Sequence, residues 1–304
     1  MKDALISFQN GEIHQPLRFI VKPPKAPGVL GLMPAYNCAD GSLGIKVVSV
    51  FPGNRSKGKD AHQGAVLLFS GETGEVAGVF NASAITAIRT AAVSAVATDV
   101  LAREDACVLA VIGAGVQAEA HVAAIANVRP LTHVRIASRS NTQALALREK
   151  LKKNHAIEIE VAEDIQKALE GADIIVTATT SREPVLKREW IPRGAHINAV
   201  GSSTGRAREI DTATVKDANL FVDSILSAEN EAGDYLVPLQ EGEITRGHIR
   251  GELGAVLCGK IEGRRSRDEI TLFKSVGIAA EDLAAAVYLY DEALRQKAGT
   301  IVDL

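Results

Sequence analysis

The chain has 304 residues, 46% of them hydrophobic, and a formal net charge of −3 at pH 7. This length fits one large or two ordinary domains, and the interspersed charges indicate neither a nucleic-acid partner nor a membrane partner. The three cysteines, Cys38, Cys107 and Cys258, are far apart, so neither a disulfide framework nor a zinc site is indicated. The first residues contain no apolar signal region, and we expect a cytoplasmic protein.

The first 80 residues are predicted to form strands without intervening helices. The candidate strands are 17–21, 30–33, 43–51, 65–69 and 76–79. A helix over 84–102 follows, with Ser83 as its expected N-cap. The loop 53–60 resembles a phosphate-binding P-loop, but Asp60 replaces the required Ser or Thr and a strand follows, so a solvated loop is favoured.

From Cys107 the pattern changes to alternating strands and helices, which predicts a doubly wound parallel sheet of the Rossmann type. The expected strands are 108–113, 133–138, 157–161, 172–178, 195–200 and 219–223. The expected helices are 116–128, 141–153, 164–170, 211–217 and 225–232. A final Ala-rich helix is predicted from about Asp268 or Lys274 to Lys297.

The stretch CVLAVIGAGVQA (107–118) is typical of a dinucleotide-binding turn. Gly113 would make the tight turn after the strand, and Gly115 would let a pyrophosphate approach the backbone. The phosphates would then lie at the helix N-terminus, where unpaired N–H groups and the helix dipole favour an anion. A glycine turn in another α/β sheet is the alternative.

Arg139 follows the second strand of this sheet, where a cofactor with a free ribose 2′-hydroxyl usually meets an acidic residue. Neither Asp nor Glu is present, so NADP(H) is favoured over NAD(H). The alternative is a solvated arginine at the start of a helix.

Two basic residues lie where apolar ones are expected. Arg89 shares a helix face with Ile85 and Val93, and Lys46 alternates with Val48 on a strand. A cation on an apolar face is costly unless an anion meets it. With Arg18 on an earlier strand, these residues favour a site for the carboxylate of an amino or imino acid, and snorkelling or buried ion pairs are the alternatives.

Asp223 ends an apolar strand, and ligands of open α/β sheets lie beyond the carboxyl ends of the strands. It could hold an amine or iminium group or relay a proton, and an N-cap of the next helix is the alternative. The histidines show no metal-binding spacing, so no metal is predicted. A G-x-S-x-G match at 201–205 lacks the helix that a hydrolase nucleophile requires.

The chain resembles the ornithine cyclodeaminase/mu-crystallin family along nearly its whole length. The matching stretches are VLGLMPAY (29–36), IKVVSVFPGN (45–54), HQGAVLLF (62–69), ITAIRTAAVSAVAT (85–98), VIGAGVQAEAH (111–121), INAVGSSTGRAREID (197–211) and TLFKSVGIAAEDLAAA (271–286). The resemblance implies a homodimer with a substrate and dimerisation domain formed by 1–102 and 274–304. A Rossmann domain, 103–273, is inserted between these parts.

The resemblance also implies roles for individual residues. Arg18, Lys46 and Arg89 correspond to cations that bind the substrate carboxylate, and Lys46 and Asp223 correspond to catalytic residues. The positions at which the family holds its cofactor are His62, Gln63, Arg89, Thr90, Gly115, Val116, Gln117, Ser138, Arg139, Ser140, Val200 and Ser275.

Two departures from the family pattern bear on function. Ornithine cyclodeaminases are expected to carry a glutamate just before the L-M-P motif, where this chain has Gly31. The chain also starts later than most relatives and is expected to lack a leading helix or strand. We therefore expect an NAD(P)H-dependent reductase of a small cyclic α-imino acid, or the reverse amino-acid dehydrogenase. The alternatives are an ornithine cyclodeaminase, which forms proline and ammonia with NAD recycled, and a non-catalytic NADPH-dependent binder of a small carboxylate.

Overall fold

The computed structural model describes residues 1–302, which form two compact units. Unit 1 consists of Met1–Arg89 and the segment from Ile278 onward, and unit 2 consists of Thr90–Gly277. These divisions differ from the boundaries expected after residues 102 and 273. The first division falls inside helix α2 (Ala82–Leu101), which runs unbroken from one unit into the other.

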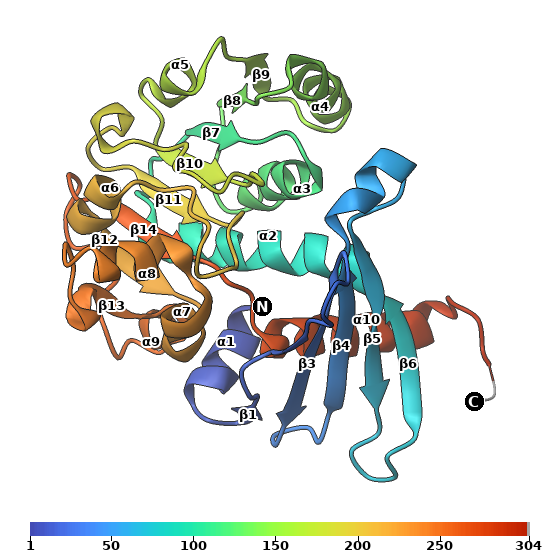
Figure 1. The fold of residues 1–304 in the computed structure, drawn as a ribbon. Coiled ribbons are helices and arrows are strands. Elements are labelled where there is room, and N and C mark those ends of the chain that lie inside the picture. The colour runs from blue at the N-terminus through green and yellow to red at the C-terminus, as the bar shows by residue number, and fades with distance from the viewer. Residues whose placement is uncertain (303–304) are drawn as a thin grey trace. The chain divides into compact units, whose positions relative to one another are not determined.

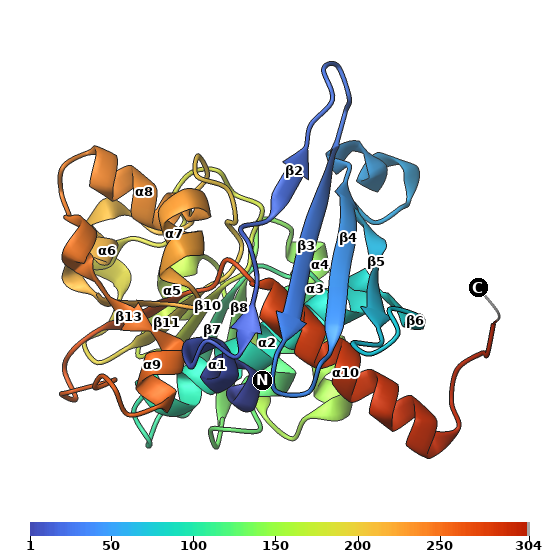
Figure 2. The ribbon, with the colours of Figure 1, turned by 90° about the horizontal axis from the view of Figure 1, so that it is seen from below.

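Unit 1 is an antiparallel sheet with a helix against it. Its strands are β1 (Ile13–His14), β2 (Phe19–Val21), β3 (Val29–Asn37), β4 (Leu43–Val50), β5 (His62–Phe69) and β6 (Val76–Asn81). They follow the order β1-β3-β4-β5-β6, and β2 pairs with β3. The other elements are α1 (Lys2–Gln9), the 3₁₀ segment η1 (Pro52–Lys57), the start of α2 and α10 (Ala279–Gln296). Helix α10 packs across β3, β4, β5 and β6 (Figures 1 and 2).

Strand alternation determines which face of this sheet is buried. Met33, Lys46 and Val66 are directly paired across β3, β4 and β5, and all three are buried. Val66 also belongs to an apolar cluster with Ile85 and Ala286, which come from α2 and α10. Lys46 is therefore the charged member of the row of side chains on the buried face of the sheet.

Two sequence predictions for unit 1 are wrong, and one helix is not predicted. Residues 2–9 form helix α1, in a segment for which no element is predicted. Asn81, not Ser83, caps α2, because its side chain accepts the Ala84 N–H at 3.0 Å while the Ser83 hydroxyl donates to the His62 carbonyl. The last helix begins at Ala279, since residues 271–274 form a strand of unit 2.

Unit 2 is an eight-stranded parallel sheet in the order β13-β12-β14-β11-β10-β7-β8-β9. Its strands are β7 (Val108–Ile112), β8 (His133–Ala137), β9 (Glu158–Val161), β10 (Ile174–Thr177), β11 (His196–Ala199), β12 (Asn219–Val222), β13 (Ile249–Glu252) and β14 (Thr271–Lys274). The helices are α3 (Val116–Ile125), α4 (Asn141–Asn154), α5 (Ile165–Leu169), α6 (Thr212–Asp217), α7 (Ile225–Glu231), α8 (Gly233–Gln240) and α9 (Leu253–Leu257), with 3₁₀ segments η2 (Arg188–Trp190) and η3 (Arg246–His248).

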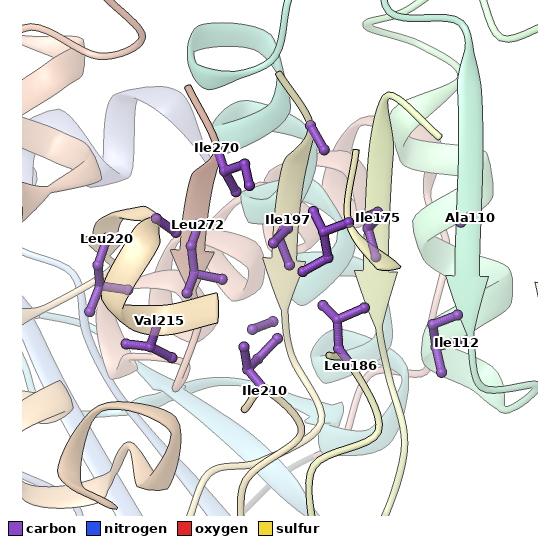
Figure 3. Packing of buried hydrophobic residues seen from close by; sticks show 14 of the residues in the cluster. Ala110, Ile112, Ile175, Leu186, Ile197, Ile210, Val215, Leu220, Ile270 and Leu272 are labelled. Atoms are coloured by element: carbon purple, nitrogen blue, oxygen red, sulfur yellow. The ribbon is translucent and has the colours of Figure 1, made fainter. Parts of the chain in front are cut away.

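Both faces of this sheet are buried, as continuous apolar strands predict. Figure 3 shows one face, where Ile112, Ile175, Ile197 and Leu272 project from neighbouring strands into a common core. The alternate residues of the same strands pack into a second cluster on the other face. The predicted Rossmann-type fold is confirmed, whereas β13, β14, α8 and α9 are not predicted.

Helix α2 is long and apolar enough to cross a membrane by length and composition alone. In the structure, however, 56% of its most apolar window is buried, and buried core helices meet the same criteria. The helix is therefore weak evidence for a membrane span.

Candidate active site

Unit 1 holds two of the predicted cations in one buried cluster. Lys46 lies on β4 and Arg89 on α2, with 4% and 5% of their surfaces exposed. Both contact Asp282, whose Oδ2 lies 2.6 Å from Lys46 Nζ and whose Oδ1 lies 3.1 Å from Arg89 Nε. Glu281 Oε2 lies 2.5 Å from Arg89 Nη1. The structure thus contains the buried ion pairs that the sequence leaves open as an alternative, and the carboxylate-binding role stays a prediction.

The two carboxylates lie in the first turn of α10, where the helix dipole favours negative charge. Burial lowers the pKa of Lys46 to about 8, although the negative charge of Asp282 opposes that shift. Arg89 and, more weakly, Arg18 also lower this pKa, so both arginines act electrostatically on Lys46. Such a group titrates close to neutral pH, where an acid–base residue is effective.

The remaining predicted residues of unit 1 are spread over several elements. Arg18 is half-buried between β1 and β2. His62 and Gln63 are exposed at the start of β5, and the Gln63 amide donates to the Asp60 carbonyl at 3.2 Å. Their proposed contacts with a cofactor are not tested by these observations.

In unit 2 the glycine turn has the geometry that a dinucleotide requires. Gly113 has φ +123°, and a Cβ there would lie 2.5 Å from the Ala178 carbonyl oxygen. Gly115 is the N-cap of α3, no side chain caps that helix, and a Cβ at Gly115 would meet no atom within 4 Å. The turn follows β7, whose neighbours β10 and β8 lie on opposite sides, which is the point where strand order reverses. These features fit a pyrophosphate at the first turn of α3, beside Val116 and Gln117.

The segment after β8 carries the next three predicted cofactor residues. Arg139 is exposed, Ser140 caps α4 by accepting the Gln143 N–H, and the Ser138 hydroxyl accepts the Ser140 N–H. The arginine therefore projects from a segment that is ordered by two serine side chains.

Asp223 is buried at the end of β12 and is held by backbone groups. Its Oδ2 accepts the N–H groups of Val276 at 2.8 Å and Gly277 at 2.6 Å, and the Ser275 hydroxyl lies 3.4 Å away. The N-cap of α7 is Ser224, so the capping alternative for Asp223 is wrong. Two predicted site residues, Asp223 and Ser275, thus lie together at the carboxyl ends of β12 and β14.

A second buried network fixes the loops that follow β10 and β11. The Glu209 carboxylate accepts the Thr177 hydroxyl at 2.8 Å and the N–H groups of Thr179 at 2.6 Å and Gly201 at 2.7 Å. Burial raises its pKa. Nearby, Lys274 is fully buried, bonds to a backbone carbonyl and lies 3.0 Å from Asp234. This network orders the loop that contains Val200, another predicted cofactor residue.

Among residues 1–302, no group of three His, Cys, Asp or Glu side chains is arranged to hold a metal ion. The absence of a metal stays a prediction.

The sequence matches a known protein family along nearly its whole length. A family model described as the ornithine cyclodeaminase/mu-crystallin family matches residues 1–297. The chain belongs to this family. Ketimine reductase mu-crystallin of Mus musculus is 38% identical over 294 residues, which cover 96% of this chain and 90% of the mouse protein. A Delta(1)-pyrroline-2-carboxylate reductase of Bacillus cereus is 37% identical over 301 residues, which cover 99% and 92% of the two chains.

Two solved structures share the fold of this chain over nearly its whole length. The Delta(1)-pyrroline-2-carboxylate reductase of Thermococcus litoralis, in complex with NADH and L-proline, matches with a TM-score of 0.96 and 40% identity. The match covers 99% of this chain and 93% of that one. An archaeal alanine dehydrogenase dimer with bound NAD matches with a TM-score of 0.93 and 30% identity, over 100% and 92% of the two chains.

Sequence reasoning missed the acidic partners of the predicted cations in this family member. Glu281 and Asp282 lie in a stretch that the sequence predicts to be the interior of a long, Ala-rich helix. The usable signal is the pair of adjacent acids just after Gly277, at a point where a helix can begin. The buried position of Lys274 is not predicted, because a lysine interrupts the apolar pattern by which a buried strand is identified.

Proposed function

We propose that this chain is an NAD(P)H-dependent reductase of a small cyclic α-imino acid, which also catalyses the reverse dehydrogenation of an amino acid. The observation that carries the proposal is the pair of cations, Lys46 on β4 and Arg89 on α2, buried together in unit 1. Its support is the likeness to pyrroline-2-carboxylate and ketimine reductases along the full chain.

The chemistry divides between the two units. Arg89 and Lys46, with Arg18, bind the substrate carboxylate through charge-assisted hydrogen bonds. Such positioning lowers the entropic barrier of the reaction. Protonation of the imine nitrogen, with Lys46 and Asp223 as the candidate acid–base groups, makes the C=N carbon electrophilic. The nicotinamide cofactor supplies the hydride when it is bound to unit 2.

We propose NADP(H) as the preferred cofactor because of the residues that follow β8. Arg139 is exposed there, and the segment Ser138–Ser140 contains no acidic residue to pair with a ribose 2′-hydroxyl. A guanidinium at this position suits a 2′-phosphate.

The surroundings of Gly31 favour the reductase over ornithine cyclodeaminase. A Cβ at this position would contact Ile20 Cδ1 at 3.4 Å and Val48 Cγ1 at 3.5 Å. The surroundings of Gly31 are therefore aliphatic, and the glutamate of the cyclodeaminases is missing. These groups offer no partner for the side-chain amine of ornithine.

We also propose a homodimer and a cytoplasmic location. Unit 1 exposes several large apolar side chains on β2 and the start of β3, which a second copy would bury: Phe19, Ile20, Val21 and Leu30. The three cysteines are free, which suits a reducing compartment.

The decisive experiment is an NADPH and NADH oxidation screen against five- and six-membered cyclic imino acids, with ornithine plus NAD as the cyclodeaminase substrate. Turnover of a cyclic imino acid supports the proposal. Release of ammonia from ornithine without net NADH change would select the cyclodeaminase, and cofactor binding without turnover would select the non-catalytic binder.

A substitution then tests the role of Arg89. Arg89→Lys keeps the charge but loses the planar guanidinium, so kcat/KM should fall roughly 10- to 100-fold while cofactor affinity is retained. The matched control is Arg129→Lys, a buried arginine of unit 2 that donates to backbone carbonyls. This control should lower stability without changing kcat/KM. Equal effects of the two variants would contradict the carboxylate role.

A further inference from the structure

The buried cluster of unit 1 contains a shared carboxylate whose role the proposed function does not explain. Asp282 contacts both cations, with one carboxylate oxygen on Lys46 and the other on Arg89. Its neighbour in sequence, Glu281, forms an ion pair with Arg89. Asp282 therefore connects the two cations directly.

Burial makes this connection important. At most 5% of the surface of any of the four residues is exposed, and removing one partner of a buried ion pair leaves an uncompensated charge. The Lys46 ammonium is on a flexible four-carbon chain, so its position depends on the group that receives its hydrogen bonds. Asp282 is the carboxylate whose oxygen lies 2.6 Å from that ammonium.

We propose that Asp282 is a positioning residue that orients Lys46 and Arg89 together for the imino-acid substrate, while Glu281 supports Arg89. The inference rests on the proposed function, because it assigns both cations to the substrate. The inference gives two residues of α10 a role in positioning the cations. Neither residue touches substrate or cofactor in this proposal.

The two acids should differ in their effect on the protonation of Lys46. Asp282 of α10 raises the pKa of Lys46, while burial, Arg89 of α2 and Arg18 of the segment before β2 lower it. Asp282→Asn removes the largest influence that favours the ammonium, so the pKa of Lys46 should fall below its value of about 8. Glu281 is not among the largest influences on this pKa, so Glu281→Gln should change it less.

The test compares Asp282→Asn with Glu281→Gln in the full-length protein. Kinetics are measured as pH profiles of kcat/KM for imino-acid reduction. In Asp282→Asn we expect the alkaline limb to move to lower pH by about one pH unit or more, and KM to rise by up to about 100-fold. In Glu281→Gln we expect KM to rise while the limb moves less than in Asp282→Asn. A limb that does not move in Asp282→Asn, or that moves equally in both variants, overturns the proposal.

Two further measurements keep the proposal testable if Asp282→Asn folds poorly. Asp282→Glu retains the carboxylate, so it should keep the limb near the wild-type pH while KM rises. A ¹³C NMR titration of the Lys46 Cε resonance, assigned by its loss in Lys46→Met, reports the coupling without any turnover. If Lys46→Met retains full activity, the substrate role that the proposed function assigns to Lys46 fails. If Lys46 is required but its titration ignores position 282, only the inference about Asp282 fails.

Discussion

Alanine substitutions at the two glycines of the β7–α3 turn should separate folding from cofactor binding. At Gly113 the φ of +123° is strained for alanine by about 1–3 kcal/mol. The new Cβ would also lie 2.5 Å from a backbone carbonyl that cannot rotate away, and overpacking costs about 1–3 kcal/mol more. We therefore expect Gly113→Ala to lower the free energy of unfolding by at least about 2 kcal/mol.

At Gly115 the same change should leave stability nearly intact. The backbone there, φ −96° and ψ −171°, is allowed for alanine, and a Cβ would meet open space. Loss of a glycine N-cap costs less than about 1 kcal/mol. If the cofactor pyrophosphate approaches this position, however, the methyl group would hold it away, and the Kd for NADPH or NADH should rise at least about tenfold, equivalent to roughly 1.4 kcal/mol.

Urea unfolding followed by circular dichroism gives the stability, and nicotinamide fluorescence on titration gives the Kd. The expected pattern is a destabilised Gly113→Ala and a stable but weakly binding Gly115→Ala. Wild-type affinity in Gly115→Ala would refute the placement of the pyrophosphate, and wild-type stability in Gly113→Ala would refute the steric argument.

Three other predictions concern unit 2. Arg139→Glu should shift the NADPH/NADH preference in kcat/KM toward NADH by about tenfold or more, and an unchanged ratio would remove Arg139 from the 2′-phosphate site. Thr177→Val deprives buried Glu209 of a hydroxyl donor, so the free energy of unfolding in urea should fall by about 1–3 kcal/mol. Buried His121 and His196 have pKa values lowered to about 4 and about 3 by burial, so the unfolded chain binds more protons below pH 6.5. The free energy of unfolding should then decrease as the pH is lowered below 6.5, by up to about 1.4 kcal/mol per pH unit for each histidine. His121→Gln should reduce this pH dependence in urea unfolding measured between pH 5 and 7.

The Rossmann-type sheet could be predicted because its signals are local. Strand, glycine turn and helix follow one another within 107–118, and the apolar runs of the later strands are short and bounded. The exceptions are β13 and β14, and in β14 Lys274 and the Ala-rich stretch that follows favour a helix. The buried partner Asp234 and a backbone carbonyl explain how a lysine is accommodated at the end of a central strand.

The candidate site could be predicted only in part, because its partners are distant in sequence. Lys46 and Arg89 are identifiable as charges on apolar faces, which is a property of their own segments. Their partner Asp282 lies 193 residues beyond Arg89, and nothing local connects the two. A single sequence therefore shows that these cations need anions, but leaves open whether the protein or the substrate supplies them.

The division of unit 1 between the two ends of the chain has a consequence for biosynthesis. During translation the strands β1–β6 leave the ribosome long before α10, which supplies both the apolar cover of the sheet and the acids for Lys46 and Arg89. The nascent sheet must wait with an uncovered face and unbalanced cations while all of unit 2 is made, a state prone to aggregation. Unit 2 is contiguous and can fold first, so the emergence of α10 should be the step that permits unit 1 to form.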